Sequence, residues 1–286
     1  MAFEGASFLL QWAAGGLLFL WVTTRRHEVS LGYGWLMRGT YGLFALGAAA
    51  VGFFVIDTVW VRDVASLLTA LVAFAVLGVS VVRRKAGVSG QKELAEARTA
   101  RVAAMTGIDR RPEAKAEDPG PEFNPDLDLI APIIGFLGVI GTGLVEGDPA
   151  WLATVRLVVG AAFLGAVTDA MLLGHWYLVQ PGMARGPLLE QVRWVGYLWF
   201  PEVALMLVPV GMVSVFNGTI DDGYGGLLGW FWLACAATTI GLVIVTRLAL
   251  RERAYSAVMA ATGLLYLAIL TAFGTDLVAR ALLSGH

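Results

Sequence analysis

The chain has 286 residues, of which 58% are hydrophobic and 15% charged, and its mean hydropathy is +0.73. Soluble domains lie nearer ~45–50% apolar and ~25% charged, so the composition excludes a water-soluble globule and indicates that lipid surrounds most of the chain. The net charge of −2 gives no reason to expect a nucleic-acid partner. A single cysteine, Cys235, excludes an internal disulfide framework and a multi-cysteine metal site.

Long apolar runs determine the expected fold. A spanning helix needs ~20 mostly apolar residues, because ~1.5 Å of rise per residue must cross ~30 Å of hydrocarbon. The pattern predicts an all-α, polytopic membrane bundle of about eight transmembrane helices, and counts of seven or nine stay open. The runs are Ala6–Thr23, Gly34–Ile56, Val64–Val82, Leu129–Val145, Trp151–Leu173, Val192–Phe216, Leu227–Arg247 and Tyr255–Ala279.

Basic residues predict the orientation, because lysine and arginine in short loops stay on the cytoplasmic side. They gather in the connections after the first, third, fifth and seventh runs, whereas the other side has only Arg62 and Arg280. Eight spans with both termini on the non-cytoplasmic side satisfy this pattern. Met1–Gly5 lacks the features of a cleaved signal peptide, so we expect the first span to be retained in the cell membrane. The preference for arginine over lysine favours a bacterial inner or plasma membrane.

The predicted organisation has three parts. Residues 1–82 form helices one to three, residues 83–128 a cytoplasmic loop, and residues 129–286 helices four to eight. Within the loop, Gln91–Met105 predicts a basic helix that could lie on the anionic inner leaflet, and Pro112–Asp128 predicts a proline- and acid-rich linker. The loop is the expected contact strip for other membrane subunits.

Ionisable residues inside spans are candidates for function, because each costs at least ~2.5–3.5 kcal/mol to insert. Glu202 lies about ten residues into the sixth run, near the predicted midplane, in the sequence Trp199–Glu202 with Pro209 further on. The prolines free backbone carbonyls and favour a kink with a polar pocket. Glu202 would be a proton carrier or general base, or a protonated acid that only holds helices together.

Asp169 lies toward the cytoplasmic end of the fifth run, four and eight residues after Gly165 and Ala161. This stripe of small residues predicts close approach of another helix. Arg38 lies at a similar depth and is expected either to pair with Asp169 or to extend to the membrane surface.

Arg156 lies near the outer boundary of the fifth run. Asp57 and Asp276 are the acidic residues expected at that level, so a structural ion pair and a functional role are both open for Arg156.

A stretch of aromatic residues that includes His175 and Tyr177 closes the fifth run. An imidazole among aromatic rings near Asp169 would suit a quinone headgroup or a proton entry route, and an interfacial aromatic belt is the alternative. Haem is disfavoured, because only His27 and His175 lie on this side and the four stacked histidines of a two-haem bundle are absent. No metal site is expected.

Three functions are consistent with these features. The first is an integral subunit of a larger energy-transducing membrane complex of respiratory type, in which Glu202, Asp169 and His175 line a proton or quinone path. The second is a proton-coupled transporter of a small molecule, which predicts inverted repeats; a loose likeness between residues 35–51 and 151–167 is the one match. The third is a membrane-embedded enzyme acting on lipids or isoprenoids.

Overall fold

The three-dimensional structure is a computed structural model. It describes residues 4–106, 120–146, 148–180, 183–207, 211–252 and 254–283, and these residues contain helices and no strand. The long helices of the bundle are α1 (Gly5–Thr24), α2 (Leu31–Phe54), α3 (Trp60–Val82), α5 (Ile130–Glu146), α6 (Ala150–Val179), α7 (Gly186–Leu207), α9 (Leu227–Ala249) and α10 (Tyr255–Leu283). The shorter elements are η1 (Arg83–Ala86), α4 (Ser89–Thr106), η2 (Pro125–Leu129) and α8 (Met212–Phe216).

The fold is a multi-pass membrane helix bundle, as the apolar runs predicted. In the described ranges, seven helices are long and apolar enough to cross a membrane. The remaining long helix is α7, whose hydropathy is lowered by Glu190, Arg193 and Glu202. It packs alongside the others, between α6 and α9. The eight predicted runs thus correspond to the eight long helices of the described structure. Seven of these helices are long and apolar enough to span a membrane by their length and composition.

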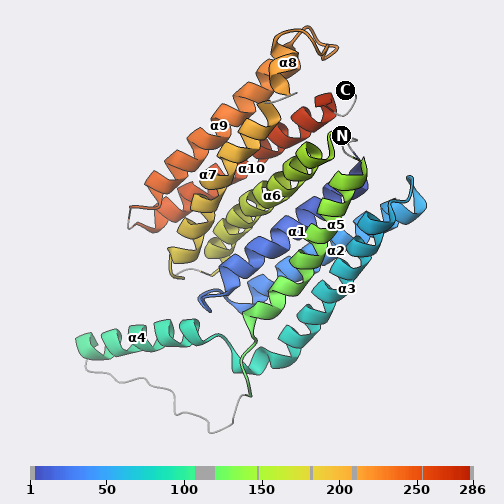
Figure 1. Ribbon diagram of the computed structural model, residues 1–286. Helices are drawn as coiled ribbons and strands as arrows, with labels where there is room; N and C mark the ends of the chain where they lie inside the picture. Colours follow the sequence, from blue (N-terminus) through green and yellow to red (C-terminus); the bar gives the residue numbers. More distant parts are fainter. Residues whose placement is uncertain are drawn as a thin grey trace.

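The long helices form two rings of four. α1, α2, α3 and α5 pack around one another, and so do α6, α7, α9 and α10. The rings meet where α1 and α5 pack against α6 (Figure 1). Successive long helices run in opposite directions, so α1 and α6 run in the same direction and the two halves have parallel topology. In this arrangement the second-ring counterpart of α2 is α7 and not α6, so the likeness between the α2 and α6 sequences does not follow the division into two rings.

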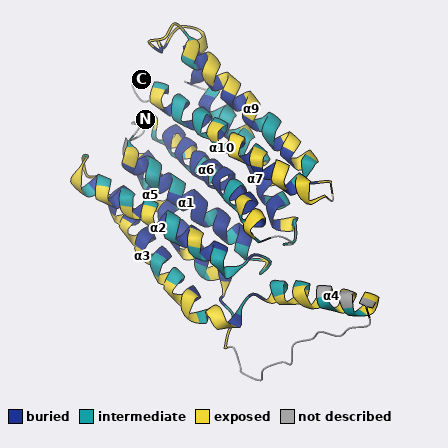
Figure 2. Cartoon of the chain, turned by 180° about the vertical axis from the view of Figure 1, so that it is seen from behind, coloured by how far each residue is buried: buried dark blue, intermediate teal, exposed yellow. Residues whose placement is uncertain are grey.

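Helices α1 and α6 form the centre of the bundle, and Figure 2 shows them as the most deeply buried. They approach so closely that a Cβ atom on Gly15 would overlap the carbonyl oxygen of Ala161, and one on Gly165 would overlap the backbone of Gly15. Small residues allow such backbone contact in lipid, where dispersion replaces the hydrophobic effect as the driving force. The stripe that leads to Asp169 thus packs against another helix, as predicted.

The outward faces of the flanking helices expose large apolar side chains, which suits contact with lipid. Leu71 of α3, Trp230 of α9 and Leu270 of α10 are each more than half exposed. The apolar surface of the bundle is therefore the surface expected for a bilayer environment.

The two ends of the bundle differ. Both chain termini lie at one end, named here the terminal end, and α4 extends from the other, named the loop end (Figure 1). The predicted helix Gln91–Met105 corresponds to α4, and no described element packs extensively along it.

The expected linker Pro112–Asp128 lies partly outside the described residues, which resume at Gly120. From there the chain packs back onto the bundle and does not behave as a solvated linker. Phe123 and Asp128 are 4% and 3% exposed. This segment closes the loop end between α1 and α2.

Candidate functional site

A cluster of charged and polar side chains is buried near the terminal end, mostly inside the second ring. It draws residues from four helices, and each is at most 5% exposed. They are Gln11 of α1, Arg156 of α6, Glu202 of α7, and Asp276 and Arg280 of α10.

Arg280 is held by contacts on two helices. Its Nε donates to Asp276 Oδ1 at 2.7 Å, and its Nη1 donates to Gln11 Oε1 at 2.6 Å. The amide of Gln11 in turn donates to the Leu157 carbonyl at 2.7 Å. Gly160 faces the guanidinium, and a side chain there would overlap Arg280 Nη2, so the missing Cβ makes room for the cation.

Arg156 is positioned by a carbonyl that a proline leaves free. Its Nε donates to the Leu205 carbonyl at 2.8 Å. In a continuing helix this carbonyl would accept from residue 209, but Pro209 has no N–H. Arg156 also lies near the charges of Glu202 and Arg280. Of the two acidic residues considered for this level, Asp276 belongs to the cluster, whereas the backbone of Asp57 accepts from Arg62.

Glu202 is fully buried, and both of its carboxyl oxygens lack a hydrogen-bond donor among the described residues. Its carboxyl group lies near the charged groups of Asp276, Arg280 and Arg156. Asp276 Oδ2 and Arg280 Nη2 are also buried without a hydrogen-bond partner in the described part of the chain. The cluster therefore contains two neighbouring carboxyl groups, of Glu202 and Asp276, and one N–H group of Arg280 that donates to no described residue.

The structure corrects the depth expected for Glu202. The sequence predicts one span over the sixth apolar run, Val192–Phe216, but α7 begins at Gly186 and ends at Leu207, and α8 is a separate helix. Glu202 is therefore about 8 Å from the terminal end of its helix and not at its middle.

Asp169 lies in a second buried group, between the two rings. Tyr41 donates its phenol hydrogen to Asp169 Oδ1 at 2.6 Å, and the Tyr33 phenol lies 3.4 Å from Oδ2. Both tyrosines come from α2 and are fully buried. Asp169 is thus contacted by two neutral donors and not by Arg38, so the predicted ion pair between Arg38 and Asp169 is wrong.

Arg38 is paired inside the first ring. Its Nε and Nη2 donate to the two carboxylate oxygens of Asp128 at 2.6 and 2.7 Å, and its Nη1 lies 3.3 Å from Ser80 Oγ. The Phe123 ring covers the guanidinium at 4.5 Å. Because Arg38 is 1% exposed, it does not extend to the membrane surface either. The sequence did not reveal this pair, because the proline- and acid-rich pattern that ends at Asp128 predicts a solvated linker.

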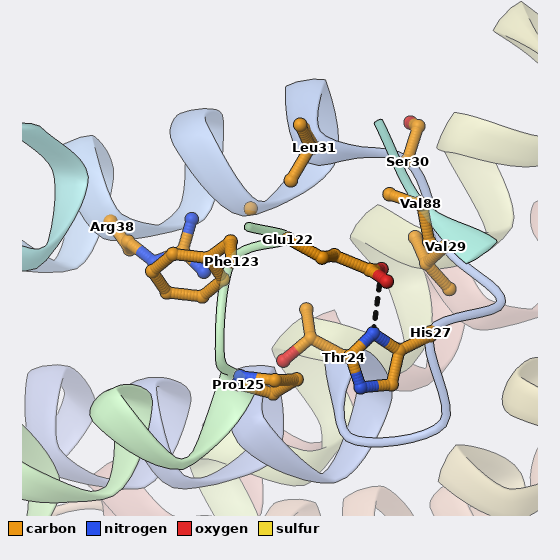
Figure 3. A pocket seen from close by; sticks show the side chains of 11 residues that line it. Thr24, His27, Val29, Ser30, Leu31, Arg38, Val88, Glu122, Phe123 and Pro125 are labelled. Atoms are coloured by element: carbon orange, nitrogen blue, oxygen red, sulfur yellow. Dashed lines mark hydrogen bonds and ion pairs between the residues drawn. The ribbon is translucent and has the colours of Figure 1, made fainter. Parts of the chain in front are cut away.

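A small pocket of about 20 Å³ lies beside this pair at the loop end, enough for one water molecule. Figure 3 shows the His27 ring directed at the Glu122 carboxyl across it, with Thr24 and Arg38 also on its wall. His27 Nδ1 and Glu122 Oε1 are 2.8 Å apart. The side chains of Glu122 and Asp128 thus both hold the segment that closes the loop end.

The remaining candidates are dispersed. His175 is exposed and its Nδ1 lies 3.1 Å from the Tyr266 hydroxyl of α10. Tyr177 is buried and donates to the Ala184 carbonyl, and Trp199 donates to the Ala236 carbonyl at 2.9 Å. None of these contacts connects to Asp169, so the structure does not assemble the quinone or proton-entry group that the aromatic stretch suggested.

Sequence reasoning named Glu202 and Arg156 but did not include Gln11 or Arg280 in their cluster. One signal was available for Arg280: it follows Asp276 by four residues in the same apolar run, which places the two side chains on one helix face. The predicted depth of these residues in the membrane does not show that this face of α10 packs toward α6 and α7.

No group of three or more histidine, cysteine, aspartate or glutamate side chains in the described ranges is placed to hold a metal ion. Comparison of the chain with protein-family models, with curated proteins and with solved structures found no match. The chemistry of the buried clusters is therefore the basis on which a function is argued.

Proposed function

We propose that this chain is a proton-conducting subunit of a larger energy-transducing membrane complex, and that Glu202 and Asp276 together bind the transferred proton. The observation that carries the proposal is that Glu202 and Asp276 are buried near each other while both Glu202 oxygens and Asp276 Oδ2 lack hydrogen-bond partners among the described residues. Each of two neighbouring buried carboxyl groups disfavours ionisation of the other, because their negative charges repel. One proton shared between them removes the conflict.

The hydrogen-bond inventory supports this assignment. A proton on Glu202 would donate to Asp276 Oδ2 and thereby give a partner to one oxygen of each carboxyl group. A water molecule between the other Glu202 oxygen and Arg280 Nη2 would donate to the first and accept from the second, so both atoms would have a hydrogen-bond partner. One proton and one water thus satisfy four buried atoms that otherwise lack partners.

The charges around Glu202 and Asp276 suit the reversible binding of a proton. Arg280 neutralises Asp276 directly, and Arg156 supplies a second positive charge beside Glu202. That charge lowers the cost of ionising Glu202, while burial raises it. Opposing effects of this kind allow a carboxyl group to gain and release a proton, whereas a permanently neutral acid would only hold helices together.

The orientation follows from the basic loops. Residues Arg25, Arg26, Arg83, Arg84 and Lys85 all lie at the loop end, so this end faces the cytoplasm and both termini face outward across the plasma membrane. The carboxyl pair is then in the outer part of the bundle.

Partner subunits are expected at the loop end. α4 leaves the bundle as a polar helix without extensive packing in the described structure (Figure 1). A helix of this kind gains stability when another protein packs against it. We assign α4 to the contact strip between this chain and its complex.

A proton-coupled transporter is the second candidate. It is favoured by the two rings of four helices with parallel topology, because transporters are often built from like halves. In that case the same carboxyl pair would couple proton movement to a small molecule.

Proton flux tests the proposal. The protein, with whatever subunits accompany it from its native membrane, is placed in liposomes containing a pH-sensitive dye, and a potassium diffusion potential is applied. Internal pH should change with the wild type and be nearly unchanged with Glu202→Gln. Glu190→Gln is the matched control, because Glu190 is on the same helix but pairs with Arg25 near the surface. Equal flux with Glu202→Gln and the wild type would contradict the proposal.

A further inference from the structure

We propose that four basic side chains at the loop end bind the headgroup of an anionic phospholipid, whose acyl chains lie against α3. The four side chains are Arg83, Arg84, Lys85 and Lys92, named here the basic patch. The inference goes beyond the proposed function, and neither its argument nor its test involves Glu202.

Three members of the basic patch extend from a turn that is fixed to the bundle. α3 ends at Val82 and continues directly as η1, which carries three consecutive cations. Ala86 and Val88 follow on either side of Gly87, and both are buried. Because the backbone is anchored by these two apolar side chains, the three cations have a defined place beside the end of α3.

The fourth cation lies over the same turn. Gly87 has φ of 70°, a conformation that favours glycine. A Cβ atom there would lie 3.2 Å from Lys92 Cε and 3.8 Å from Lys92 Nζ. The N–H of Lys92 donates to the Val88 carbonyl, so the first turn of α4 sets its position. The patch therefore combines cations from η1 and α4 at one point of the surface.

The protein itself does not neutralise the basic patch. No ion pair to any of its four members occurs within the described ranges. Glu122, in the segment that closes the loop end, is engaged by His27. Asp128, in the same segment, is engaged by Arg38. Like charges gathered in this way repel one another, and an anionic ligand relieves the repulsion.

Tryptophan side chains place the patch at the level of the lipid headgroups, because indole rings favour the boundary between membrane and water. Trp35 Nε1 donates to Ser80 Oγ at 3.0 Å, and Ser80 belongs to the last turn of α3. Trp21 and Trp176 lie in the last turns of α1 and α6 at the same end of the bundle. The basic patch begins directly after this level.

An apolar surface adjoins the cations and favours a lipid over an acidic protein segment. Val82, next to the patch, is 82% exposed, and Val79 and Val81 are also exposed. Figure 2 shows exposed residues along this end of α3. A phospholipid offers a phosphate and then acyl chains, in the order in which the cations and the valines follow each other along the surface.

A lipid bound here would connect η1 with α4. Lys92 belongs to α4 and the other three cations belong to η1, so one headgroup that contacts both would fix the direction in which α4 leaves the bundle (Figure 1). The later turns of α4 remain for the contact strip with partner subunits.

Native mass spectrometry of the full-length protein in detergent tests the inference. Phosphatidylglycerol and phosphatidylcholine with identical acyl chains are added in turn, and the wild type should retain phosphatidylglycerol in preference. Arg84→Gln with Lys85→Gln should weaken its binding roughly tenfold or more, because each cation near a membrane surface contributes severalfold. Arg247→Gln with Arg251→Gln is the matched control, because these two cations are also exposed at the loop end but lie by the end of α9. It should bind as the wild type does.

Four results would overturn the inference. Equal retention of the two lipids, or equal weakening by the two double variants, would mean a general attraction of anionic lipid to the surface. Displacement of the bound lipid by an equal concentration of glycerol phosphate, the headgroup without chains, would mean that α3 takes no part. A patch that serves an acidic protein segment would retain neither lipid.

Lys92→Gln tests the site from a second element. Because Lys92 is exposed, the variant should fold as the wild type does, which thermal unfolding checks. Binding of phosphatidylglycerol should weaken severalfold, and Lys92→Arg, which keeps the charge, should restore it. Unchanged binding in Lys92→Gln would contradict the joint site on η1 and α4.

Discussion

The guanidinium of Arg38 contacts both carboxylate oxygens of Asp128, a residue ninety positions later in the chain, at 2.6 and 2.7 Å. Both side chains are almost completely buried. Because Asp128 ends the segment that follows the long loop, this ion pair fixes the position of that segment against α2. The closure of the loop end therefore depends on the ion pair between Arg38 and Asp128, in which each charge neutralises the other.

Removing one partner of this pair should destabilise the protein strongly. Asp128→Leu or Arg38→Met leaves an uncompensated buried charge, which costs about 3–5 kcal/mol. The double variant Arg38→Met with Asp128→Leu should recover much of that loss, since no charge remains buried. Thermal unfolding of the purified variants in detergent measures the effect, and additive losses in the double variant would show that the two residues are not coupled.

The contact between α1 and α6 should tolerate no side chain at Gly15. Gly15→Ala would drive a methyl group into the Ala161 carbonyl, and overpacking of this kind costs about 1–3 kcal/mol. Gly39→Ala is the control, because a Cβ on Gly39 of α2 meets open space. It should be neutral or stabilise the helix by roughly 0.5–1 kcal/mol. Equal midpoints of thermal unfolding for the two variants would contradict the close contact.

The attachment of residues 120–128 should weaken in acid. Burial raises the pKa of Glu122, but hydrogen bonds from the Ser89 N–H and from His27 outweigh it and lower the pKa below its ordinary value of 4.5. A carboxyl group whose pKa is lowered by folding stabilises the folded state above its unfolded pKa. That contribution is lost as the pH falls through the lowered value.

Backbone hydrogen exchange over residues 120–128, corrected for the intrinsic effect of pH, measures this weakening. Protection should decrease in acid in the wild type and should already be reduced at neutral pH in Glu122→Gln. The same protection in both proteins at every pH would show that the Glu122 contacts do not hold the segment.

The two members of the carboxyl pair should respond differently to amide substitution. Glu202→Gln replaces a protonated acid by a neutral group of the same shape, so stability should change by less than about 1.5 kcal/mol. Asp276→Asn removes the negative charge beside Arg280 and should cost about 3–5 kcal/mol. Chemical or thermal unfolding compares the two variants, and equal losses would mean that Glu202 is ionised in the folded protein.

The spans were predictable, because a helix that crosses lipid must be long and apolar and must pair its backbone groups internally. A run of about 20 apolar residues in the sequence therefore indicates such a helix. The end of α7 at Leu207 was harder to predict from the sequence, because the apolar run continues beyond that residue. The stripe of Ala161, Gly165 and Asp169 correctly indicated a packed face, since spacing on one helix determines which residues share a face.

The side-chain contacts between different helices could not be predicted from the sequence. Arg38 and Asp169 have similar depths, yet depth does not specify how each helix is rotated about its axis. In the structure α2 directs its tyrosines at Asp169 and Arg38 at Asp128. The nearness of Glu202 to Asp276 likewise depends on how α7 and α10 pack, and no local sequence pattern determines that packing.

The central claim is that Glu202 and Asp276 share a proton. Infrared spectroscopy of the purified protein at neutral pH, compared with Glu202→Gln, tests it most directly. The account predicts a carboxylic acid band in the wild type that disappears in Glu202→Gln and shifts in Asp276→Asn. A wild-type spectrum without that band, in protein shown to be folded, would mean that both carboxyl groups are ionised and would contradict the account.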